Sequence, residues 1–225
     1  MANRSFSLSF LSSIFATVAF FLSLSSAYNC NYVQFTTVED TGISIGFGLW
    51  AHNWYAVSPN LNGSMMIFQA CIGYGSVAID GSMMAARIFA TLTFIYGGMF
   101  FFGNVIRGCV NPNKRTSTNL TRSEGMVFFL TGLFQSLSLL ILNSPTVCKN
   151  NQLIAQLQSG INERENLQIE FNDTCAISTG ARCCIAAIVF WFLAGLASCH
   201  AKSAAKKEEE DGDNLRDPLI NESLL

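Results

Sequence analysis

Cysteine is the residue type whose number and spacing predict chemistry most clearly in this sequence. The chain has eight cysteines, and four of them fall two by two into two polar segments that lie between apolar stretches: Cys30 and Cys71, then Cys148 and Cys175. Cysteines that occur in pairs outside the cytosol typically form disulfides. Four cysteines allow three connectivities, of which pairing within each segment is the simplest.

Catalytic and metal chemistry have few candidate residues. The two histidines, His52 and His200, fall in segments that the charge pattern places in different compartments, so they cannot form one site. The sequence has no Cys-x-x-Cys, His-Glu-x-x-His or phosphate-loop motif. A net charge of −2 without a basic patch gives no argument for nucleic acid. We therefore expect no catalytic residue, cofactor, metal, nucleic acid or small-molecule substrate.

The remaining cysteines lie in or beside apolar stretches, at Cys109, Cys183, Cys184 and Cys199. We expect them to be small residues that are buried or face lipid. Palmitoylation of Cys109 or Cys199, close to the membrane surface, is the alternative.

The elements that would position these residues are four apolar stretches. Hydrophobic residues make up 50% of the chain and charged residues 12%, about half the charged fraction of a soluble domain. The stretches are each about 17–24 residues long, enough for a helix to cross a hydrocarbon core of ~30 Å. They cover Phe6–Ala27, Met83–Ile106, Gly125–Leu142 and Cys183–Cys199.

The first stretch has two interpretations. Arg4 and the small residues Ser25-Ser26-Ala27 are typical of a cleaved signal peptide, and its many serines weaken it as a helix that faces lipid. Its apolar run is longer than the usual signal core, which favours a retained helix. Both interpretations place Tyr28 outside the cytosol.

The distribution of positive charge predicts the orientation. Arg107–Glu124 holds four Lys or Arg residues and the tail begins with three lysines, whereas Tyr28–Ser82 contains none. Cytosolic loops are rich in Lys and Arg, so the segments that hold the paired cysteines face outside and both termini are cytosolic if the first helix is kept. We expect a multi-pass protein of the plasma membrane, reached through the secretory pathway, with exterior glycosylation sequons at Asn62 and Asn172.

The predicted fold class is a membrane α-helical protein, a four-transmembrane helix bundle with a small antiparallel β-sheet extracellular domain. The first exterior segment alternates β-branched or aromatic residues over Tyr28–Val38, Gly42–Val57 and Met65–Tyr74, which predicts three strands. A Cys30–Cys71 disulfide would tie the first strand to the last. In the second segment, 150–168 is polar and partly helical, and Ile169–Phe171 is a short strand candidate.

The predicted organisation has eight parts. They are the first helix or signal segment 1–27, the exterior β-rich loop 28–82, the second helix 83–106, the cytosolic loop 107–124, the third helix 125–142, the second exterior loop 143–180, the fourth helix 181–200 and a disordered cytosolic tail 201–225. The tail is predicted to lack structure because its charged block cannot bury enough apolar surface.

Three motifs together resemble the claudin superfamily, which includes claudins, peripheral myelin protein and the gamma subunits of calcium channels and glutamate receptors. They are Gly48-Leu49-Trp50, then Cys71, then Ala85-Ala86-Arg87 sixteen residues further on, at the entry to the second helix. The resemblance implies four helices, a longer first and shorter second exterior loop, and a short strand from the second loop. The family's usual first loop cysteine falls here on Asn53, so Cys30 is expected to take over its pairing role, and the chain looks like a divergent relative.

Two motif residues have physical interpretations beside the resemblance. Trp50 is either an anchor at the membrane interface or an ordinary core aromatic. Arg87 lies near the outer end of the second helix, where an unpaired charge is costly. We expect it to extend outward or to pair with a carboxylate such as Asp80; a ligand or ion role is the alternative.

The resemblance and the lipid-embedded composition lead to three hypotheses. The first is a claudin-like tetraspan that acts in cell-surface adhesion, barrier formation or membrane organisation, by self-association or with a membrane protein partner. In that case Glu39 and Asp40 would bias a pore between chains toward cations. The second is an auxiliary subunit of a membrane channel or receptor, and the third, a membrane enzyme, has the least support.

Overall fold

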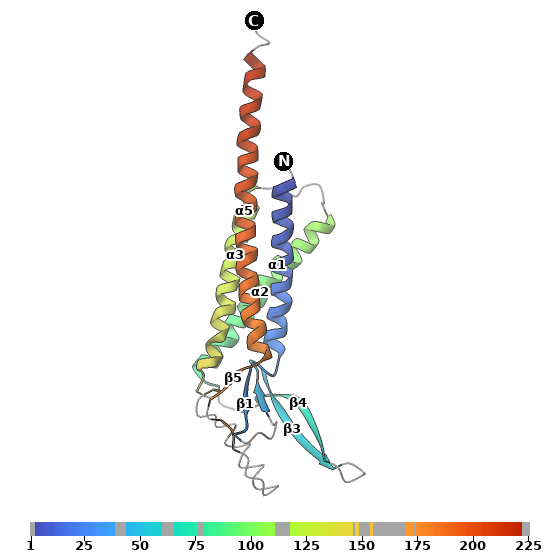
Figure 1. Cartoon of the computed structure of the whole chain (residues 1–225), viewed down its shortest axis with the longest axis vertical. Coiled ribbons are helices and arrows are strands. Elements are labelled where there is room, and N and C mark those ends of the chain that lie inside the picture. The colour runs from blue at the N-terminus through green and yellow to red at the C-terminus, as the bar shows by residue number, and fades with distance from the viewer. Residues whose placement is uncertain are drawn as a thin grey trace.

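The computed structural model shows a bundle of long helices with an antiparallel sheet at one end, called the outer end (Figure 1). The described residues are 3–38, 44–59, 65–75, 79–110, 118–145, 147–148, 154, 170–172 and 174–221. In chain order the elements are α1 (Asn3–Tyr28), β1 (Val33–Thr36), β2 (Ser44–Phe47), β3 (Ala51–Pro59), β4 (Met65–Gly73), α2 (Gly81–Val110), α3 (Thr118–Leu137), the 3-10 helix η1 (Ser138–Asn143), β5 (Ala176–Ile177) and α5 (Thr179–Asn221).

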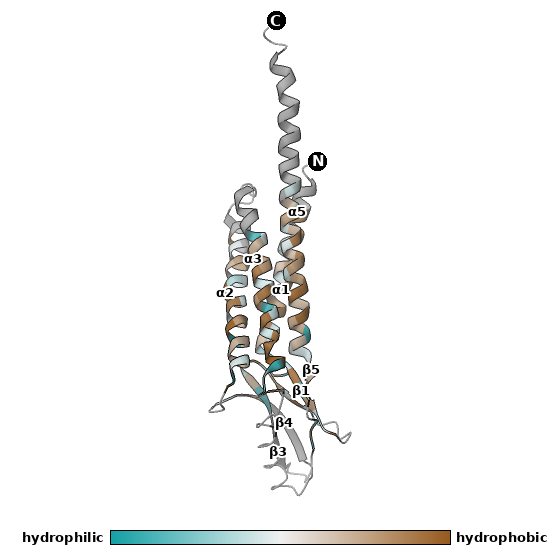
Figure 2. Cartoon of the chain, turned by 90° about the vertical axis from the view of Figure 1, so that its left-hand side faces the viewer, coloured by the Kyte–Doolittle hydropathy of each residue, from teal (hydrophilic) through white to brown (hydrophobic). Residues whose placement is uncertain are grey.

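Four spans among the described residues are long and apolar enough to cross a membrane. They cover Leu8–Tyr28, Gly81–Gly103, Glu124–Asn143 and Thr179–Ala201, and Figure 2 shows apolar residues along all four helices. Each span overlaps one of the predicted stretches, because hydropathy is a local property of the sequence. The helix count and the small antiparallel sheet of the predicted fold class are confirmed, and the four spans indicate a multi-pass membrane protein.

Two serines of α1, Ser12 and Ser23, face α5. Ser12 Oγ donates to Ala194 O at 2.9 Å and lies 2.7 Å from Ser198 Oγ. Further along, the Trp191 Nε1–H donates to Ser23 Oγ at 3.2 Å. All five residues are buried, so these two serines are turned into the bundle, whereas Ser9 and Ser25 are exposed.

The sheet has the strand order β4-β3-β2-β1-β5, and every neighbouring pair is antiparallel. The predicted single strand at Gly42–Val57 is wrong: the structure divides it into β2 and β3. The Gly48 N–H donates to Ala51 O at 2.8 Å and closes a tight turn, after which Phe47 and His52 pair. The period-two pattern continues through Leu49 and therefore hid this turn.

The second loop supplies the fifth strand at a different place from the predicted one. Phe171, in the predicted strand, forms an isolated bridge with Thr37, whereas regular pairing occurs at β5, where Ile177 faces Val33. Two residues are too few for alternation to reveal a strand. The sheet thus combines both loops, as the resemblance implied.

The sheet and the outer ends of the helices share one hydrophobic core. Buried residues from the strands pack with buried residues of the helices in a single cluster, which includes Tyr32, Val33, Phe35, Phe47, Leu49, Met83, Ala86, Ile141 and Ala181. The orientation of the sheet on the bundle is therefore fixed by packing rather than by the connecting chain alone.

The predicted disorder of the tail is wrong for most of its length, because α5 continues as a helix to Asn221. Residues 201–210 are rich in Ala, Lys and Glu, which are strong helix formers. A helix that is already formed in the apolar span extends without a new nucleation step. Charge alone was therefore a poor guide to disorder here.

Candidate functional site at the junction of sheet and bundle

The Gly48-Leu49-Trp50 turn between β2 and β3 lies against the point where α1 leads into the sheet. A Cβ atom on Gly48 would overlap the carbonyl oxygen of Asn29 and approach Ala51 O to 2.9 Å. Both neighbours are main-chain atoms, which have little room to move. Glycine at position 48 is thus required by a close backbone approach.

Arg87 and Tyr74 hold this turn against α2. The Arg87 Nε–H donates to Leu49 O at 2.6 Å, and the Tyr74 hydroxyl donates to Gly48 O at 2.7 Å. The Arg87 guanidinium carbon lies 5.1 Å from the centre of the Trp50 ring and 5.3 Å from that of the Tyr74 ring, within cation–π range. We call these five residues, Gly48, Leu49, Trp50, Tyr74 and Arg87, the turn clamp.

Arg87 and Trp50 contact each other within the turn clamp. Arg87 contacts a carbonyl group and two aromatic rings, whereas the sequence led us to expect that it extends outward or pairs with a carboxylate such as Asp80. Trp50 is 41% exposed, so it is not an ordinary core aromatic. Burial raises the pKa of the Tyr74 hydroxyl above its ordinary value, although Arg87 opposes this shift, and the neutral phenol is the form that donates to Gly48.

Asp80 organises the start of α2. Its carboxylate accepts the Met83 N–H at 2.7 Å and its carbonyl accepts the Met84 N–H at 3.0 Å, which is the geometry of a helix N-cap. The Ser144 hydroxyl also donates to the carboxylate. Because Ser144 follows η1, Asp80 links the outer ends of two helices.

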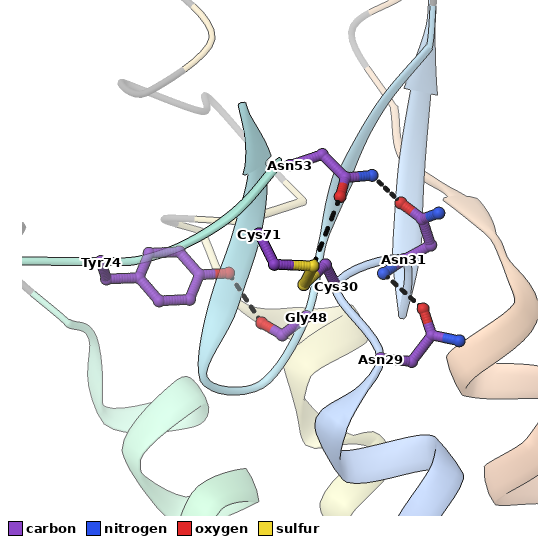
Figure 3. Close-up of a disulfide and its surroundings, with 7 residues drawn as sticks. All are labelled: Asn29, Cys30, Asn31, Gly48, Asn53, Cys71 and Tyr74. Atoms are coloured by element: carbon purple, nitrogen blue, oxygen red, sulfur yellow. Dashed lines mark hydrogen bonds between the residues drawn. A yellow bond between two sulfur atoms is a disulfide. The ribbon is translucent and has the colours of Figure 1, made fainter. Parts of the chain in front are cut away.

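The Cys30–Cys71 disulfide joins the residues just before β1 to the edge strand β4, with Cα atoms 6.0 Å apart (Figure 3). Asn53 lies beside it and faces Cys71 in the β3–β4 register. Its side chain donates to Asn31 Oδ1, and its Oδ1 lies 3.9 Å from Cys71 Sγ. A disulfide sulfur carries no proton, so the latter is a packing contact.

The second disulfide joins Cys148 to Cys175, with Cα atoms 5.0 Å apart. Both disulfides pair cysteines within one loop, the simplest of the predicted connectivities. Cys175 directly precedes β5, so this bond holds the second loop where β5 pairs with β1. The Ser178 hydroxyl adds a hydrogen bond to Gln34 Oε1 at 2.9 Å.

A buried polar cluster below β1 was not predicted from the sequence. Gln135 Nε2 donates to Cys184 Sγ at 3.0 Å, Ser138 Oγ donates to Gln135 O at 2.7 Å, and Tyr32 Oη lies 3.5 Å from Ser138 Oγ. Burial raises the pKa of Tyr32 above its ordinary value. The cluster satisfies polar groups that would otherwise be costly in a buried site, and its members are too far apart in sequence for any local pattern to connect them.

The histidines and sequons have separate positions. His52 is buried between the rings of Phe47 and Tyr74, and this burial lowers its pKa; His200 lies near the opposite end of the α5 span. Asn172 is exposed and its side chain donates to Thr36 Oγ1 at 2.9 Å. Asn62, Glu39 and Asp40 lie outside the described residues.

Within the described part of the chain, no group of three or more His, Cys, Asp or Glu residues is arranged to hold a metal ion. The contacts of the junction hold a sheet in a fixed position on a bundle. Comparison with models of known protein families and with curated proteins finds no match for this chain.

Proposed function

We propose that this chain is a claudin-like tetraspan that acts in cell-surface adhesion, barrier formation or membrane organisation, with no catalytic role. The observation that carries the proposal is the turn clamp. Arg87 and Tyr74 hold the turn between β2 and β3 directly on α2, so the bundle presents the sheet as a fixed surface. A fixed surface beyond a membrane is suited to binding other proteins.

The contacts among the motif residues support the claudin-like part of the proposal. Leu49 and Arg87 lie 38 positions apart in the sequence. They are nevertheless joined by a hydrogen bond, and the ring of Trp50 contacts Arg87. Asn53, where the family usually has a cysteine, faces Cys71 across two strands. Residues that the resemblance groups together therefore also lie together in space.

We propose self-association through the outer edge of β4 as the means of action. β4 is nine residues long and lies at one end of the strand order, with β3 as its neighbour. An edge strand presents unpaired N–H and C=O groups to another chain. Ile72 on this strand is 43% exposed, which adds an apolar contact to the edge.

We propose the plasma membrane as the location, with the sheet outside and both termini cytosolic. The absence of Lys and Arg from residues 28–82 supports this orientation. The hydrogen bonds of Ser12 and Ser23 with α5 support retention of α1, because release of α1 would leave the buried Trp191 N–H without its acceptor.

Two differently tagged copies of the full chain, expressed together and purified in mild detergent, test the function. We expect each copy to co-purify the other, and Ile72→Asp to reduce this about tenfold because the interface would bury a carboxylate. Ile177→Asp is the matched control, since Ile177 is also 43% exposed but lies on the opposite edge strand. Recovery of one large channel or receptor without a second copy would favour an auxiliary subunit instead.

Glycan mapping and the mass of the mature chain test the orientation. We expect a glycosidase to reduce the mass of the wild type, Asn172→Gln to lose one glycan, and the N-terminal residues before Tyr28 to be present. A glycan on Asn119 or Asn221, which the proposal places in the cytosol, would contradict the orientation.

A further inference from the structure

The Arg87 guanidinium has donors that the turn clamp does not use. An arginine carries five N–H donors, and the Nε–H donates to Leu49 O. The Trp50 and Tyr74 rings contact the cation, and the Tyr74 hydroxyl already donates to Gly48. In the part of the chain that the structure describes, the other guanidinium donors have no acceptor and the charge has no carboxylate partner.

The surroundings of Arg87 on α2 open toward lipid. Arg87 is half-buried, while Met84, Ile88 and Ile95 on the same helix are exposed apolar residues. Trp50, on the other side of the guanidinium, is also exposed. The exposed part of Arg87 therefore borders the apolar surface of the bundle.

The charge pattern of α2 places Arg87 at the edge of the hydrocarbon layer, although the apolar span as a whole begins at Gly81. Residues 88–106 contain no charged side chain, and Arg107 is the next charged residue. Twenty residues of helix, at ~1.5 Å each, span ~30 Å, which is the thickness of the hydrocarbon core. If Arg107 marks one boundary, Arg87 lies at the other, at the level of lipid phosphate and ester groups.

We propose that Arg87 binds the phosphate of a phospholipid in the outer leaflet, with the acyl chains of that lipid along Met84, Ile88 and Ile95. The planar guanidinium is suited to bidentate hydrogen bonds with phosphate oxygens. Leu49 O and the two rings fix its orientation, and Trp50 borders the headgroup as tryptophan does at membrane interfaces. The same arginine thus holds the turn and a lipid, so the lipid would lie directly beneath the sheet.

Native mass spectrometry of the purified wild-type chain tests this site without any substitution. Phosphatidylcholine and phosphatidylglycerol are compared with diacylglycerol that carries the same acyl chains. We expect the phospholipids to be retained at least about tenfold more than diacylglycerol, because hydrogen bonds to a charged group change affinity by about this factor. Equal retention of diacylglycerol would overturn the proposal. So would full competition by inorganic phosphate, because the site would then take a free anion rather than a lipid.

Substitutions assign the binding to Arg87. Arg87→Gln should abolish the preference for phospholipid, Arg87→Lys should keep part of it, and Arg182→Gln should keep all of it. Arg182 is the matched control because it is an exposed arginine at the outer end of α5. An equal loss in Arg182→Gln, or full retention in Arg87→Gln, would overturn the proposal. These readouts do not depend on self-association, so the proposed function can fail separately.

Discussion

Besides its packing on the bundle, the sheet is held by covalent bonds and directional hydrogen bonds, whereas the seam between α1 and α5 is held by small residues in close contact. On the sheet side, two disulfides and the turn clamp connect segments from both loops. In the seam, Ala16, Ala19, Ala187 and Ala194 are buried around Trp191, with a few serine hydrogen bonds.

The difference follows from the solvent that we propose for each region. A small domain in water buries too little apolar surface to be stable alone, so cross-links add much of its stability. Between helices in lipid there is little hydrophobic driving force, and close packing of small residues takes its place. Substitutions in the two regions should therefore have effects of different size.

The largest effect is expected from removal of the Cys30–Cys71 disulfide. The two cysteines are 41 residues apart, and closing a loop of that length contributes about 4 kcal/mol in the chain-entropy model. The paired variant Cys30→Ser, Cys71→Ser should lower the free energy of unfolding of the sheet by about this amount, measured by denaturant titration in detergent. Cys199→Ser is the control, because Cys199 is an exposed free cysteine. Equal stability of both proteins would show that packing on the bundle suffices.

Substitutions of one glycine in the sheet and one on α2 that faces the seam should give the next largest effects. Gly48→Ala places a methyl group against main-chain atoms, whereas Gly97→Ala places it 2.9 Å from the Trp191 side chain. We expect Gly48→Ala to cost about 3 kcal/mol and Gly97→Ala about 1 kcal/mol, since a side chain can shift. Thermal unfolding of both variants is compared with Gly81→Ala, where the added methyl meets open space. A larger cost for Gly97→Ala would reverse the comparison.

The turn clamp should also make the sheet sensitive to alkaline pH. Burial raises the pKa of Tyr74 above its ordinary value of 10.0, so the unfolded chain loses this proton first as pH rises. The contribution of Tyr74 to the free energy of unfolding should therefore be constant below pH ~10 and decrease by up to ~1.4 kcal/mol per pH unit above it.

Tyr74→Phe tests this pH dependence. At pH 7 it should cost about 1 kcal/mol, because the hydrogen bond to Gly48 is lost. Above pH 10 the free energy of unfolding of the variant should decrease about half as steeply as that of the wild type, because burial also raises the pKa of Tyr32, which the variant keeps. Denaturant titrations at pH 7 and pH 11 measure both effects. If the free energy of unfolding of the variant decreases with pH as steeply as that of the wild type, Tyr74 ionises in the folded protein as readily as in the unfolded chain.

The sequence predicted the helices and the disulfides because both depend on local signals. Hydropathy identifies each span on its own, and two cysteines in each loop leave one simple pairing. The turn at Gly48 was missed because the period-two pattern runs through it, and the need for glycine there comes from a distant residue, Asn29, whose carbonyl excludes any side chain. The acceptor of Arg87 was missed for a related reason: it is a main-chain oxygen, which no sequence pattern marks.

The serines of α1 show the limit of composition as a guide. Their number weakened the first stretch as a membrane helix, yet Ser12 and Ser23 are buried against α5. Their role is visible only in their contacts with Ala194 and Trp191, to which they are hydrogen-bonded. Composition counts polar residues, whereas stability depends on whether each one finds a partner.

The smallest effect is expected from the hydrogen bond between Trp191 Nε1 and Ser23 Oγ, 3.2 Å long. A double-mutant cycle with Ser23→Ala and Trp191→Phe separates this bond from the volume that Trp191 fills. We expect a coupling energy of about 0.6 kcal/mol, because helices apart from one another in lipid find other partners for their polar groups. The coupling energy is measured by unfolding the four proteins of the cycle in detergent. A value above about 2 kcal/mol would mean that the seam relies on directional bonds as strongly as the sheet does.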